Sequence, residues 1–165
     1  MSSDTLSAPG VGEPAPEFEL FTNENEPWKL SKHLDSPVVL LFFPGAFTSV
    51  CTTELNTVNN DLDRFEDAQV VGISTDSPFV LDEFRSVHEF AFPLLSDHNA
   101  KVSEMYGAKY QANFTPMNLD RISKRAAFVV DEEGTIRYKE ILENAGNQPD
   151  LEAIVDTISD LDSAS

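Results

Sequence analysis

The sequence VVLLFF, residues 38–43, restricts the fold of this chain more than any other feature. Its β-branched and aromatic residues favour an extended backbone, and Pro44-Gly45 ends the run at once. A strand without polar positions has to be covered on both faces, as the strands of parallel sheets are. The run therefore predicts a strand in the centre of an α/β fold.

Helix-like and strand-like patterns alternate after this run. Behind a cap at residues 48–49, the apolar residues as far as Phe65 keep a rough helical period, and residues 69–75 (QVVGIST) are typical of a second buried strand. The tripeptide DSP at residues 76–78 marks the start of another helix, which runs to about Glu89. A strand, a helix and a strand in this order imply two parallel strands with a right-handed crossover.

The remaining elements are shorter, and together they indicate the fold class. The patterns predict strands at 18–20, 28–30, 126–130 and 136–139, an extended piece at 92–97, helices at 101–106 and 149–161, and a loop at 108–124. The order is that of a thioredoxin-like α/β sandwich, a central mixed β-sheet flanked by helices. At 165 residues we expect a single domain, with residues 1–16 as a largely irregular N-terminal tail.

The composition is strongly acidic, with 29 acidic against 11 basic residues and a net charge of −18. Such a surface repels phosphates and anionic lipids, so we expect neither nucleic acid nor membrane as a partner. It also suits a salt-rich cytoplasm, since the Debye length falls to about 3 Å at 1 M salt. The N-terminus has neither a basic nor an apolar signal region, so we expect a cytoplasmic protein.

Cys51 is the only cysteine of the chain, which excludes an intrachain disulfide and a thiolate zinc site. We expect no metal and no cofactor. Taken alone, Cys51 is open to two interpretations. It is either a small buried hydrophobic residue or a reactive nucleophile in the first turn of a helix.

A nucleophilic cysteine needs a nearby cation in this chain. A thiol ionises freely only near pH 8.5, and shifting that to pH ~6 requires about 3.4 kcal/mol. A helix N-terminus supplies typically 0.3–1 kcal/mol, and Glu54, one turn from Cys51, opposes a second negative charge. Of the five arginines, Arg125 is best placed, because the strand that follows it is expected to pair near the strand that ends at Pro44.

Four motifs resemble a known family. Pro44-x-x-x-Thr48-x-x-Cys51 is similar to the active-site signature of peroxiredoxins, and the segment RAAFVVD at residues 125–131 matches their second signature. FPLLSD at residues 92–97 and EGTIRY at residues 133–138 also resemble the family. The resemblance to AhpC/TSA-like peroxiredoxins covers nearly the whole fold.

The resemblance implies a role for each site residue. Cys51 would attack the terminal oxygen of a peroxide and become a sulfenic acid, while Thr48 holds thiolate and peroxide in line. Pro44 would keep water off the sulfenic acid. Arg125 would favour the thiolate and stabilise charge as the O–O bond breaks, and Glu54 would support it by orienting the guanidinium.

The chain lacks the second, resolving cysteine of many peroxiredoxins. It therefore resembles the one-cysteine type, in particular the alkyl hydroperoxide reductase E group. The sulfenic acid would be reduced by an external thiol, either a small thiol or a thioredoxin- or glutaredoxin-like protein. The resemblance thus implies a thiol-dependent peroxidase of antioxidant defence, acting on hydrogen peroxide, organic hydroperoxides or both, as a homodimer or higher homo-oligomer.

Other functions fit the residues less well. A cysteine-dependent acyl hydrolase needs a paired histidine, and a thioredoxin-type oxidoreductase needs Cys-x-x-Cys; the sequence supports neither. The main alternative is a non-catalytic thioredoxin-fold binding or chaperone-like module in which Cys51 is incidental.

Overall fold

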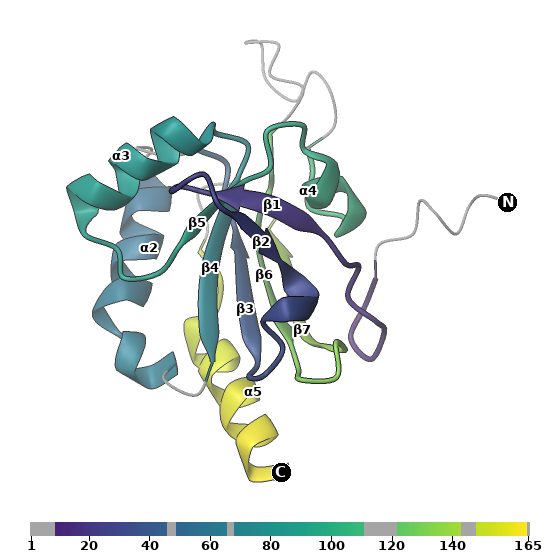
Figure 1. Cartoon of the computed structure of the whole chain (residues 1–165). Helices are drawn as coiled ribbons and strands as arrows, with labels where there is room; N and C mark the ends of the chain where they lie inside the picture. The colour runs from purple at the N-terminus through teal and green to yellow at the C-terminus, as the bar shows by residue number, and fades with distance from the viewer. Residues whose placement is uncertain (1–8, 46–48, 66–67, 111–121, 143–147, 165) are drawn as a thin grey trace, which may run out of the picture.

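The computed structural model of the chain describes residues 9–45, 49–65, 68–110, 122–142 and 148–164 (Figure 1). In these ranges, seven strands form one mixed sheet in the order β2-β1-β5-β4-β3-β6-β7. The strands are β1 (Glu19–Thr22), β2 (Pro27–Lys29), β3 (Val38–Phe42), β4 (Gln69–Ser74), β5 (Leu94–Ser96), β6 (Arg125–Val130) and β7 (Ile136–Leu142).

Helices lie on both faces of this sheet, which confirms the predicted thioredoxin-like sandwich (Figure 1). The α-helices are α2 (Ser49–Asn60), α3 (Pro78–His88), α4 (Lys101–Met105) and α5 (Leu151–Ala164), and the 3-10 helices are η1 (Leu30–Lys32) and η2 (Leu62–Phe65). α2, η2, α3 and α5 pack on one face, while η1 and α4 pack on the other. In the described part of the chain, no helix is long and apolar enough to cross a membrane.

Strand β3 lies at the centre of the sheet, as its composition predicts. It pairs in parallel with β4 and antiparallel with β6. All five of its residues are buried, and their side chains alternate between the two cores. Val39 and Leu41 pack beneath α2 and α3, whereas Leu40 and Phe42 pack beneath α4. Because each face has its own helices, β3 has no position for a polar side chain.

The predicted helix over residues 49–65 is interrupted. α2 ends at Asn60, where the backbone N–H of Asp61 is shared between the carbonyls of Thr57 and Val58. The run Asn59-Asn60-Asp61 favours helices poorly, and the chain tightens there into η2. Phe65 still packs in the same core as the apolar residues of α2, although it belongs to η2. Its apolar position therefore continues the helical period in the sequence.

The structure places the N-terminal segment and the predicted loop 108–124 against neighbouring elements. Residues 9–16 are irregular, and the N–H groups of Gly12 and Ala15 bond to carbonyls of the β6–β7 hairpin. The ends of the loop meet in an antiparallel bridge between Lys109 and Ser123. Residues 111–121, the middle of the predicted loop, lie outside the described ranges.

Candidate active site

The topology brings two distant segments together at one end of the sheet. The chain leaves β3 at Phe42 and enters α2 at Ser49, so Cys51 lies in the first turn of that helix. The neighbouring strand β6 runs antiparallel, and its Ala126 pairs with Phe42. Arg125, the first residue of β6, therefore lies just beyond the last residue of β3, beside the start of α2.

One guanidinium nitrogen connects the three side chains of the site. Nη1 of Arg125 donates a hydrogen bond to Sγ of Cys51 at 3.3 Å and to Oε1 of Glu54 at 2.6 Å. Cys51 and Glu54 have no exposed surface, and Arg125 is 1% exposed. The contact of two side chains from α2 with one side chain from β6 confirms the predicted proximity of Arg125 to Cys51.

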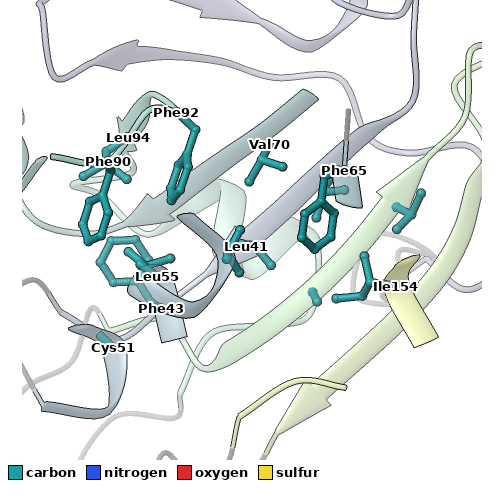
Figure 2. Close-up of a cluster of buried hydrophobic side chains, with 14 of the residues drawn as sticks. Leu41, Phe43, Cys51, Leu55, Phe65, Val70, Phe90, Phe92, Leu94 and Ile154 are labelled. Atoms are coloured by element: carbon teal, nitrogen blue, oxygen red, sulfur yellow. The ribbon is translucent and has the colours of Figure 1, made fainter. Parts of the chain in front are cut away.

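The site borders the apolar core. Cys51 packs in the same buried cluster as Phe43 and Leu55, and Figure 2 shows it at the margin of that cluster. Phe43 is fully buried, and Pro44, which follows it directly, is half-buried. The low-polarity surroundings strengthen the attraction between the guanidinium and an anion at Sγ.

Burial dominates the electrostatics of Glu54. It raises the pKa of this carboxyl to about 7, against the lowering effect of Arg125, and the charge of Glu140 adds to the rise. Burial also works against the charge of Arg125, but Glu54 and Cys51 outweigh it, so the pKa of the guanidinium is raised and the group stays charged. Oε2 of Glu54 is buried and has no hydrogen-bond partner among the described residues.

Three of the five predicted site residues, Cys51, Glu54 and Arg125, are thus in contact. Pro44 lies at the same end of β3, and Thr48 lies outside the described residues. Sequence reasoning missed Glu140 on β7. The register of the hairpin could have revealed it, because Glu140 pairs with Ala127, two residues from Arg125 and on the same face of the sheet.

The arrangement can stabilise a thiolate. A guanidinium N–H aimed at sulfur in a buried site favours negative charge there, and Glu54 accepts a hydrogen bond from the same nitrogen. A thioredoxin-like fold with such a centre defines a class, the proteins whose chemistry depends on one activated thiol.

Comparisons with known proteins show which family within this class the chain resembles. The model of the AhpC/TSA family matches residues 11–139. A peroxiredoxin of Aquifex aeolicus (strain VF5) is 34% identical over 145 residues, which cover 81% of this chain and 62% of that protein. A thiol peroxidase of Oceanobacillus iheyensis is 31% identical over 146 residues, 88% of this chain and 85% of that protein.

The solved structures agree with the sequence relatives. The crystal structure of peroxidoxin BcpB from Mycobacterium tuberculosis superposes with a TM-score of 0.82 at 29% identity, covering 93% of this chain and 98% of that one. The chain belongs to the AhpC/TSA family and is a peroxiredoxin.

The raised pKa of Glu54 predicts a pH-dependent stability. Between pH 4.5, the ordinary value of a glutamate, and about pH 7, the folded protein holds a proton on Glu54 that the unfolded chain has lost. The contribution of Glu54 to stability is therefore complete below pH 4.5 and is lost as the pH rises through 7. Glutamine does not titrate, so we expect Glu54→Gln to lack this loss. As the pH rises across this interval, the free energy of unfolding of the variant should increase relative to that of the wild type, by up to about 3 kcal/mol.

Urea unfolding of both proteins at several pH values measures the difference. Glu152→Gln is the matched control, because Glu152 also pairs with an arginine but is exposed. Parallel pH dependences for the wild type and Glu54→Gln would contradict the raised pKa.

Proposed function

We propose that Cys51 is the nucleophile with which this peroxiredoxin reduces hydrogen peroxide, organic hydroperoxides or both. The protein is a thiol-dependent peroxidase. The observation that supports this role of Cys51 best is the 3.3 Å contact between Nη1 of Arg125 and Sγ, in a site closed to solvent. The thiolate attacks the terminal peroxide oxygen, the O–O bond breaks, and Cys51 becomes a sulfenic acid while water or an alcohol is released.

Three neighbours of Cys51 complete the proposed machinery. Arg125 stabilises the thiolate and then the charge that develops on the peroxide oxygens. Thr48 aligns the peroxide with sulfur, a role that rests on its place in the Pro44-x-x-x-Thr48-x-x-Cys51 motif. Pro44, half-buried beside Phe43, limits the access of water to the sulfenic acid.

The reductant of the sulfenic acid is an external thiol. Cys51 is the only cysteine, so no resolving disulfide forms within the chain, as in one-cysteine peroxiredoxins. A small thiol or a thioredoxin- or glutaredoxin-like protein fits this requirement. The proposed location is the cytoplasm, where such thiols are kept reduced.

We also propose that the protein forms a homodimer or higher homo-oligomer. Apolar side chains project into solvent from α3, including Phe79 at 73% and Val87 at 55% exposure. A second copy would remove this surface from water. The net charge of −18 opposes association of two copies at low ionic strength, and salt screens that repulsion.

The first experiment tests the nucleophile. One equivalent of hydrogen peroxide, mixed with the reduced protein, should add one oxygen atom to Cys51 faster than to free cysteine, as measured by mass spectrometry of the intact protein and its peptides. Cys51→Ser should gain no oxygen. A thiol that reacts no faster than free cysteine would instead support the non-catalytic binding module.

A second experiment tests Arg125. Arg125→Lys keeps the positive charge but loses the planar group that reaches both Cys51 and Glu54, so we expect the rate of Cys51 oxidation at pH 7 to fall roughly 10²-fold. Stopped-flow mixing with peroxide measures this rate. Arg137→Lys is the control, because Arg137 pairs with Asp131 at the exposed turn of the hairpin. Equal rates for the two variants would exclude Arg125 from the mechanism.

A third experiment tests association. Sedimentation velocity should show a larger species at high salt than at low salt, and Phe79→Ser should remain the smaller species at high salt. Val11→Ser, which changes an exposed apolar residue of the N-terminal segment, should behave as the wild type. A wild-type monomer at every salt concentration contradicts the proposal.

A further inference from the structure

The guanidinium of Arg125 can neutralise only one negative charge in the buried site. Cys51 and Glu54 both contact Nη1 of Arg125, at 3.3 Å and 2.6 Å, and all three side chains are buried. One guanidinium neutralises one anion. A thiolate together with a carboxylate would leave a net negative charge without solvent, which is costly.

The surroundings of Glu54 favour its protonated form. Among the described residues, three elements supply its charged or titratable neighbours: α2 has Cys51, β6 has Arg125, and β7 has Glu140, whose negative charge disfavours a carboxylate at Glu54. Burial and Glu140 together hold the pKa of Glu54 near 7 in spite of Arg125. Oε2, the oxygen that does not bind the guanidinium, accepts no hydrogen bond from the described residues. Such a carboxyl gains and loses a proton readily at neutral pH.

We propose that Glu54 is the proton carrier of peroxide reduction, a role that rests on Cys51 being the nucleophile. When the thiol loses its proton to become a thiolate beside Arg125, the carboxylate of Glu54 takes up a proton. The site thereby exchanges one anion for another and keeps its charge balance with the guanidinium.

The same proton completes the reaction. The thiolate attacks the terminal oxygen of a hydroperoxide ROOH, so an S–O bond forms, the O–O bond breaks, and its electron pair leaves with RO⁻. Sulfur is oxidised by two electrons and the peroxide is reduced by two. Glu54 then gives its proton to RO⁻, which yields the alcohol, the sulfenic acid of Cys51 and the original carboxylate.

A proton carrier can be distinguished from a residue that only orients Arg125 by changing the leaving group of the peroxide. An alkyl hydroperoxide expels an alkoxide, a strong base that needs a proton. A peracid expels a carboxylate, a weak base that does not. An orienting residue serves both reactions equally, whereas a proton carrier serves mainly the first.

The test compares the wild type with Glu54→Gln, using tert-butyl hydroperoxide and peracetic acid as substrates. Glutamine keeps the size and an oxygen for Arg125 but cannot carry the proton. We expect the rate of Cys51 oxidation by tert-butyl hydroperoxide to fall roughly 10²-fold, and the rate with peracetic acid to stay unchanged or rise. The control Glu152→Gln should alter neither rate. Equal losses with both substrates would overturn the proposal and leave Glu54 an orienting residue.

The wild type provides a second measurement that does not depend on the folding of a variant. Its oxidation by tert-butyl hydroperoxide should be slower in D₂O than in water, and it should slow further at alkaline pH as Glu54 loses its proton. Oxidation by peracetic acid should show no such isotope effect. Identical isotope effects for the two substrates would overturn the proton-carrier role. A wild type that reduces neither peroxide would overturn the peroxidase function itself, which is a distinct result.

Discussion

The candidate active site depends on the hydrogen bonds of one nitrogen atom, Nη1 of Arg125. They link the first turns of α2 to the start of β6, across 74 residues of sequence, in a place without solvent. The mixed sheet makes this link possible, because β3 and β6 are antiparallel neighbours and the end of one lies beside the start of the other. The contact between Arg125 and Cys51 therefore follows from the order of the strands as much as from the residues of the motif.

Much of this fold is predictable from periodicity. The fully apolar β3 and the apolar β4 indicate central strands, and Asp131–Gly134 indicates the turn between β6 and β7. The interruption of α2 near Asn60 is harder to predict, because Phe65 keeps the apolar period although the backbone has changed to η2. The pairing of β1 with β5 is also beyond periodicity, since it depends on a contact between short strands separated by more than 70 residues.

The proximity of Arg125 to Cys51 was predictable, but the charge balance around these two residues was not. If Cys51 reacts as a thiolate, the acidic composition and the weakness of a helix dipole require a nearby cation, and the position of Arg125 before a strand predicts that this residue supplies it. Sequence does not reveal that Glu54 is completely buried or that Glu140 approaches it from β7. The burial of Glu54 and the approach of Glu140 both depend on how the β6–β7 hairpin packs against α2. Both features raise the pKa of Glu54.

The N-terminal segment has a consequence for the behaviour of the protein at high concentration. Gly12 donates to the carbonyl of Ile136, and Ile136 donates back to Glu13, so this segment occupies the outer side of β7 where that strand begins. At the opposite border of the sheet, β2 is only three residues long and starts with a proline. The N-terminal segment covers the start of β7, and β2 offers only a short edge, so both features reduce the number of open peptide groups through which another chain could add a strand.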